Sequence, residues 1–198
     1  MQVRTEQCNG RTECHDGRML RFVSKRSVHV EPARASTDAH GLRLAEHEKV
    51  ARSDWLILFA AFGGAPAGLD PVRLQQGLFL FSRCPDVPLW SKYVFKPDLY
   101  GPVSDELDVE LDRLAEDGQF ELVPVRGASW SLYKPTDAMF DQAKKILRRM
   151  ADEGLLGAAR ELFELKRFVS RAGFGELLEC IHTEYPEFVV NSVFDRPA

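Results

Sequence analysis

The sequence has little cysteine and no long apolar segment, and each shortage excludes a class of protein. Four cysteines in 198 residues are too few and too widely spaced for the disulfide framework of a small secreted domain. The longest uninterrupted apolar run, from Trp55 to Phe62, is well short of the ~20 residues that a membrane-spanning helix needs. No apolar segment follows the first charged residues, as it would in a secretory signal. We therefore expect a cytoplasmic protein with reduced thiols and no membrane contact.

The motifs of common enzyme and metal sites are also missing. The sequence contains no nucleophile elbow of the G-x-S-x-G type, no phosphate-binding loop and no complete G-x-G-x-x-G. Cys8, Cys14 and His15 have no matching second pair of the kind that structural zinc favours. Cys180 and His182 stand two apart in a helical pattern, where side chains diverge, so we interpret them as a core cysteine and a surface histidine. We expect no metal, no cofactor and no enzymatic activity.

Charge and hydrophobic periodicity divide the chain into three parts. Residues 1–45 are rich in Arg, Ser, Thr and His without a sustained apolar period, and we interpret them as a mobile basic arm or as an extension outside the native product. Helical periodicity begins at about residue 46. We expect a core over residues 46–135 and C-terminal helices over 136–198 that pack on this core.

The order of predicted elements indicates an α+β fold that is mainly helical. Two helices are followed by a short strand, an acidic helix, a β-hairpin around Arg126-Gly127-Ala128, and three more helices. The spans that we predict are helices at 48–62 and 71–83, a strand at 93–95, a helix at 104–118, strands at 120–125 and 130–133, and helices from Thr136, at 156–170 and at 174–185. A helix followed by a two-stranded wing predicts a winged-helix-like core.

The helix at 104–118 has the wrong charge for a DNA reader. It contains seven acidic residues and one basic residue, Arg113, which leaves a net charge of −6. Phosphates, which supply most of the affinity for nucleic acid, repel such a helix. Its apolar stripe is formed by Leu107, Leu111 and Leu114, and we expect this stripe to face the core.

Three stretches carry a family resemblance, namely 74–80, 100–107, and 185–188 with Ser192. The second, Tyr-Gly-Pro-Val-Ser-Asp-Glu-Leu, is the most distinctive, and Gln76 in the first stands where the relatives often have lysine. In order and spacing they resemble the YwgA-type bacterial and archaeal proteins and, more distantly, the Panacea domain of SocA-like antitoxins. The resemblance implies a winged-helix-like fold and a regulatory, antitoxin-like or defence-associated role without catalysis.

Our leading hypothesis is a regulatory protein that acts through protein contact, with a toxin or defence component as the partner. The predicted contact surface combines an aromatic turn, the acidic helix and the wing, because charge steers association and aromatic side chains supply binding energy. Its residues are Tyr100, Gly101, Asp108, Asp112, Glu116 and Trp130.

Two alternatives stay open beside this hypothesis. The first is a DNA-binding regulator that uses the arm and a basic helix, because residues 142–171 carry eight basic against four acidic residues. The basic helix would contact nucleic acid through Lys144, Lys145, Arg148 and Arg149. The same region could instead meet the acidic helix of a second copy in a homo-oligomer. The second alternative is an unrecognised enzyme, which would require a pocket.

Overall fold

The computed structural model describes residues 50–62, 68–85 and 87–194. The predicted arm, with Cys8, Cys14 and His15, lies outside the described residues. In chain order the elements are α2 (Arg52–Ala61), α3 (Pro71–Ser82), the 3-10 helix η1 (Leu89–Ser91), β1 (Lys96–Asp98), β2 (Gly101–Val103), α4 (Asp105–Glu116), β3 (Phe120–Pro124), β4 (Ser131–Pro135), α5 (Asp137–Asp152), α6 (Leu156–Arg171), α7 (Phe174–Glu184) and the 3-10 helix η2 (Pro186–Phe188). The class is α+β and mainly helical, as the sequence predicts.

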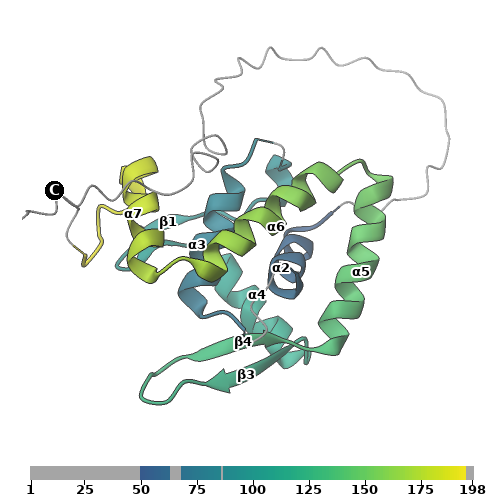
Figure 1. Cartoon of the computed structure of the whole chain (residues 1–198), viewed down its shortest axis with the longest axis horizontal. Coiled ribbons are helices and arrows are strands. Elements are labelled where there is room, and N and C mark those ends of the chain that lie inside the picture. The colour runs from purple at the N-terminus through teal and green to yellow at the C-terminus, as the bar shows by residue number, and fades with distance from the viewer. Residues whose placement is uncertain (1–49, 63–67, 86, 195–198) are drawn as a thin grey trace, which may run out of the picture. The chain divides into compact units, whose positions relative to one another are not determined.

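Helix α2 is the centre of the core, with α3, α5 and α6 packed around it (Figure 1). Every residue of α2 from Asp54 to Ala61 is buried, including Trp55 and Phe59. The close approach of α3 requires Gly77, because a Cβ at this position would lie 2.3 Å from Phe59 Cζ. The C-terminal helices α5 and α6 therefore share one core with the helices that precede them.

Short polar signals set the boundaries of α3 and α4. Asp70 accepts a hydrogen bond from the backbone N–H of Arg73 at 2.8 Å, and Pro71 occupies the first position of α3. Ser104 caps α4, and the stripe of three leucines on α4 is buried. Thr136, in contrast, does not cap α5 with its side chain; its hydroxyl donates instead to the carbonyl oxygens of Gly118 and Gln119 at 3.0 Å.

The strands form two antiparallel hairpins, β1–β2 and β3–β4. The β3–β4 hairpin, which we call the wing, pairs Phe120 with Pro135 and Leu122 with Tyr133. Leu69, between α2 and α3, adds a bridge to the other edge of β4 through two backbone hydrogen bonds with Tyr133, at 2.9 and 3.1 Å. The wing is thus joined to the helical core at two places: at Leu69, which precedes α3, and at the end of α4, which leads into β3.

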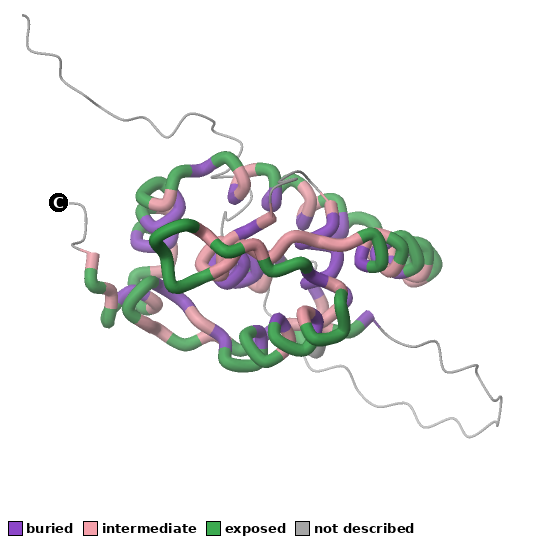
Figure 2. Tube along the Cα trace, turned by 90° about the horizontal axis from the view of Figure 1, so that it is seen from below, coloured by how far each residue is buried: buried purple, intermediate pink, exposed green. Residues whose placement is uncertain are grey.

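Two predictions about individual elements are wrong. Residues 93–95 are not a strand, because Tyr93 turns into the core, Val94 faces outward and neither pairs with a neighbouring strand; the hairpin begins at Lys96 instead. On α5 the sequence pattern predicts inward-facing Met139, Phe140, Ala143, Leu147 and Met150, but Phe140 and Leu147 are only half-buried and Ile146 is buried instead. In Figure 2 the outer sides of α5 and of the wing turn are coloured as exposed.

Buried charges are the main feature that the sequence did not indicate. Lys166 counted toward the predicted basic surface, yet it is only 1% exposed and donates hydrogen bonds to the carbonyl oxygens of Phe59 and Ala60 at 2.6 and 3.2 Å. Burial lowers the pKa of Lys166 to about 7. These carbonyls belong to the last turn of α2, where helix oxygens need donors, so Lys166 joins α6 to the C-terminal end of α2.

No helix within residues 50–62, 68–85 and 87–194 combines the length and the apolar character needed to cross a membrane.

Candidate protein-interaction surface

Helix α3 connects the three stretches of the family resemblance, which are far apart in the sequence. Gln75, which is buried, accepts a hydrogen bond from Ser104 N at 2.9 Å and donates to Ser104 O at 3.2 Å. The same amide donates to Asp108 Oδ1 at 2.6 Å. A single glutamine side chain therefore fixes the start of α4 to α3.

Gln76 holds the turn of the β1–β2 hairpin. Its Nε2 donates to the carbonyl oxygen of Tyr100 at 2.9 Å. The next residue, Gly101, has φ +105°, and a Cβ there would lie 3.3 Å from Gln76 Nε2. The turn therefore needs a glycine both for its backbone conformation and for the approach of the glutamine. This neutral contact is the role of Gln76 in the structure.

The third stretch packs against the far half of α3. The Phe79 ring lies 5.1 Å from that of Tyr185 and 4.8 Å from that of Phe188, measured between centres. These spacings are typical of favourable aromatic pairs. All three stretches therefore meet on α3. The sequence of a single stretch could not predict this contact.

The C-terminal segment also covers the β1–β2 hairpin. Val193 N donates to Leu99 O at 3.1 Å, and the rings of Tyr100 and Phe194 lie 6.0 Å apart. Phe194 contacts Phe174 of α7 at 5.2 Å between ring centres. The hairpin turn and the C-terminal segment thus form one continuous surface.

This surface exposes apolar side chains instead of burying them. Leu99 is 49%, Tyr100 52%, Val190 60% and Val193 60% exposed, and we call these four residues the apolar patch. The hydrogen bonds described above hold the backbone of Leu99, Tyr100 and Val193, so these three side chains are displayed on a fixed frame. Grouped exposed apolar side chains of this kind mark interaction sites.

The acidic helix keeps part of its charge unneutralised. Arg52 pairs with Glu106, Lys96 with Asp105 at 2.6 Å, and Arg113 with both Glu110 and Asp117. Asp112 and Glu116 are exposed and have no cationic partner among the described residues. Of the predicted acidic contacts, these two are the ones that remain available to a partner.

Asp108 has a different environment from the other predicted acidic contacts. Burial raises its pKa, the hydrogen bond from Gln75 lowers it, and the neighbouring charges of Asp105 and Asp112 raise it again. Tyr133 of the wing is near the same side of α4: burial raises its pKa, and Asp112 and Asp108 raise it further. Asp108 therefore belongs partly to the frame that joins α3, α4 and the wing.

The structure separates Trp130 from the turn of Tyr100. Trp130 is partly exposed and lies in the connection just before β4, at the end of the wing remote from Phe120. No ring contact or hydrogen bond connects it with Tyr100 within the described part of the chain. The predicted surface is thus two regions. At the region of Tyr100, sequence reasoning missed the exposed Leu99, Val190 and Val193.

The predicted nucleic-acid contacts on α5 are only partly at the surface. Lys144, Lys145 and Arg148 are exposed, and Lys144 pairs with Asp141 at 2.9 Å. Arg149 instead turns inward and forms an ion pair with the buried Asp54 of α2. Arg149 is therefore a link between α2 and α5, and three of the four predicted basic residues form the exposed face.

The interpretation of Cys180 and His182 is reversed in the structure. His182 is buried, whereas Cys180 is half-buried. The described residues contain no cluster of three His, Cys, Asp or Glu side chains that could hold a metal ion.

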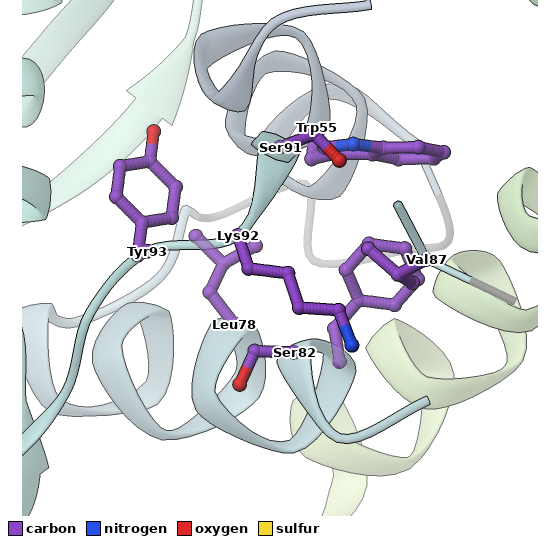
Figure 3. Close-up of a pocket in the computed structure, with 8 residues that line it drawn as sticks. Trp55, Leu78, Ser82, Val87, Ser91, Lys92 and Tyr93 are labelled. Carbon is purple, nitrogen blue, oxygen red and sulfur yellow. The ribbon is translucent and has the colours of Figure 1, made fainter. Parts of the chain in front are cut away.

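A small cavity lies between α2, the end of α3 and η1 (Figure 3). Its volume is about 10 Å³, and its lining includes Trp55, Ser91, Lys92 and Tyr93. A space of that size accommodates one water molecule at most. The buried Trp55 Nε1, which has no hydrogen-bond acceptor among the described residues, is the polar group that such a water would satisfy.

No family model, no curated protein and no solved structure matches the chain, so its function is inferred from the geometry of this surface.

Proposed function

We propose that the protein is a regulator that acts by binding a protein partner at the apolar patch of Leu99, Tyr100, Val190 and Val193. The exposure of these side chains on a hydrogen-bonded frame is the observation that carries the proposal. A partner that buries them gains binding energy without ordering the loop first. Antitoxin-like inhibition of a toxin or defence component, which the family resemblance implies, is the activity that such binding would perform.

The charge of α4 supports a basic partner. Asp112 and Glu116 are exposed without neutralising cations, and the whole segment 104–118 has a net charge of −6. Charged surfaces of this kind increase the rate of encounter with partners of opposite charge. The apolar patch would then determine how long the complex lasts.

The order of elements supports a winged-helix-like interpretation of residues 50–135. A first helix, the bridge at Leu69, a second helix, the acidic helix and the wing follow one another, and the bridge extends the wing sheet. The β1–β2 hairpin is inserted between α3 and α4, at the position where the apolar patch forms. An acidic helix in place of a basic one favours protein over DNA as the ligand of this arrangement.

Affinity capture with matched variants tests the proposal. The full-length protein is immobilised, and proteins of the native host are captured by the wild type, by a Leu99→Ser/Val193→Ser double variant and by Leu89→Ser. Leu89 is 83% exposed and lies outside the patch, so its variant controls for loss of surface apolarity in general. We expect a partner that the wild type and Leu89→Ser retain and the double variant loses.

The rate constants of the captured partner complete the test. With this partner purified, Tyr100→Ala should accelerate dissociation at least tenfold, because exposed aromatic residues that become buried carry much of the binding energy. The wild type capturing no protein, or a partner that binds all variants equally, would remove the patch from consideration.

The second candidate function is nucleic-acid binding through α5. Lys145 and Arg148 are exposed and form no ion pair among the described residues, and Lys144 is on the same side of the helix. A face of this kind can contact phosphates without using α4.

A further inference from the structure

Arg83, at the C-terminal end of α3, is held by aromatic rings. Its Cζ atom lies 4.6 Å from the ring centres of both Phe79 and Phe188 and 5.7 Å from that of Tyr185. Phe79 is completely buried, so the support for the guanidinium is anchored in the core. Contacts at these distances orient a planar guanidinium through cation–π attraction and stacking. The guanidinium of Arg83 is therefore positioned by ring contacts, without hydrogen bonds from its side-chain N–H groups.

The guanidinium N–H donors of Arg83 have no acceptor among the described residues. Arg73, on the same helix, shows the opposite arrangement: its side chain donates to Val169 O at 3.3 Å, to Ala172 O at 3.0 Å and to Asp70 at 2.5 Å. Arg73 is used internally, whereas Arg83 presents its donors to solvent. An oriented guanidinium with unused donors is suited to receive an oxyanion.

A second cation is close to Arg83. Burial lowers the pKa of Lys92, Cys84 raises it in part, and the charge of Arg83 lowers it again. Lys92 Nζ donates to the carbonyl oxygen of Cys84 at 3.1 Å, so it is fixed beside the end of α3. Neither Glu184 nor Glu187, which flank Tyr185, forms an ion pair with either cation. Neither Arg83 nor Lys92 thus forms an ion pair with an acidic side chain within the described part of the chain.

We propose that Arg83, on the rings of Phe79, Tyr185 and Phe188, is the binding site for a carboxylate group of a peptide or protein ligand. The planar fork of a guanidinium matches the two oxygens of a carboxylate in a bidentate pair. The aromatic rings beside it offer apolar area to the chain that carries this carboxylate. Lys92 contributes positive charge at longer range while remaining bonded to Cys84 O.

The carboxylate can come from a side chain or from a chain terminus, and small probes distinguish these sources. The Nε–H resonance of Arg83 is observed by NMR in the full-length protein and is assigned from its absence in Arg83→Lys. Three probes are titrated: N-acetylvaline, with a terminal carboxylate; the α-amide of N-acetylglutamic acid, with a side-chain carboxylate; and inorganic phosphate. No partner protein is needed, so failure of this site is distinguishable from failure of the apolar patch.

We expect a saturable shift of the Arg83 resonance with at least one of the two carboxylates, at millimolar concentrations or below. Arg148 is exposed without ring support and serves as the internal control; its affinity should be at least tenfold weaker. Saturation by one probe alone identifies the source of the carboxylate, and saturation by both supports the site for either source. Equal shifts at both arginines, no saturation, or tighter binding of phosphate than of both carboxylates would overturn the assignment.

Removal of a supporting ring tests the role of the aromatic residues. Phe188→Leu keeps the guanidinium but removes one of the two closest rings, and we expect carboxylate affinity to fall at least threefold. Tyr185→Leu replaces this variant if Phe188→Leu does not fold. Wild-type affinity in a folded ring variant would show that the rings do not position Arg83 and would overturn that part of the proposal.

Discussion

Lys166 Nζ on α6 donates a hydrogen bond to the carbonyl oxygen of Phe59 on α2 at 2.6 Å, and the same ammonium lies 5.1 Å from the centre of the Phe59 ring. A buried lysine thus contacts both the backbone and the side chain of one core residue. Its alkyl chain and its donors connect α2 with α6 in a place where water is excluded.

This contact predicts a pH dependence of stability. Burial lowers the pKa of Lys166 from 10.5 to about 7, so between these values the folded protein holds fewer protons than the unfolded chain. The free energy of unfolding should therefore rise with pH in this window, by up to roughly 1.4 kcal/mol per pH unit from this group. Urea unfolding of the wild type and of Lys166→Met at pH 7, 8 and 9 measures the difference in slope. Equal slopes for the two proteins would contradict it.

A second prediction concerns the close approach of α2 and α3. Gly77→Ala places a Cβ 2.3 Å from Phe59 Cζ, and Phe59 is fully buried, so the helices must move apart. We expect a loss of roughly 1–3 kcal/mol in the free energy of unfolding. Gly157→Ala on α6 is the matched control, because an added Cβ there meets no atom within 4 Å. Chemical denaturation of both variants measures their free energies of unfolding. A Gly77→Ala protein as stable as the control would contradict the close packing of α2 against α3.

The orientation of α4 supplies a third prediction. Leu111 is 1% exposed and lies in the middle of the buried leucine stripe, so Leu111→Ala should lower the free energy of unfolding by roughly 2–5 kcal/mol. The adjacent Asp112 is exposed, and Asp112→Ala should change the free energy of unfolding by less than about 0.5 kcal/mol. Similar losses in the two variants would mean that the helix presents another face to the core.

The Gln75–Asp108 hydrogen bond gives a fourth prediction. Because burial and the charges of Asp105 and Asp112 raise the pKa of Asp108, its negative charge is unfavourable in the folded state. Asp108→Asn keeps an oxygen acceptor for Gln75 without the charge and should be at least as stable as the wild type at pH 7. Asp108→Ala removes the acceptor and should cost about 1 kcal/mol. Thermal unfolding of the pair tests this, and equal melting temperatures would exclude a role for the hydrogen bond.

The sequence was sufficient for elements whose signals are local. Asp70-Pro71, Ser104 and the leucine stripe of α4 act within a few residues of the helix that they define, and these boundaries agree with the structure to within about a turn. The aromatic and β-branched residues Tyr93-Val94-Phe95 misled the strand prediction, because composition alone does not supply a pairing partner. The actual hairpin contains Pro97 and Pro102, and tertiary hydrogen bonds from α3 specify its turn.

The parts that the sequence could not give depend on contacts between distant residues. In a sequence, a lysine on a charged helix predicts an exposed side chain. Lys166 is a buried donor because α2 packs beside α6 and places the carbonyl oxygens of Phe59 and Ala60 next to it. Arg149 likewise looked equivalent to Arg148 until Asp54 provided a partner in the core. The apolar patch required the C-terminal segment to lie beside Leu99, which no periodicity encodes. One signal was available: the apolar pairs Val189-Val190 and Val193-Phe194 on either side of Asn191-Ser192.

The last prediction separates the protein-binding proposal from the nucleic-acid alternative. Binding of a basic protein should depend on the acidic residues of α4, whereas binding of nucleic acid should depend on the basic residues of α5. Asp112→Lys/Glu116→Lys changes two exposed carboxylates outside the leucine stripe, so the fold should be unaffected. For a basic protein partner this variant should associate at least tenfold more slowly at low salt and lose most of the salt dependence of its association rate.

Lys145→Ala/Arg148→Ala is the matched variant on α5, since it also changes two exposed charges without ion-pair partners among the described residues. It should leave association with the protein partner unchanged. If duplex DNA binds instead, this variant should reduce the slope of log affinity against log salt by about 2, because each phosphate contact contributes ~0.9. Stopped-flow association and DNA titrations at three salt concentrations measure both effects. Slower protein association caused by the α5 variant, with no effect of the α4 variant, would reverse the assignment and make the basic face of α5 the functional surface.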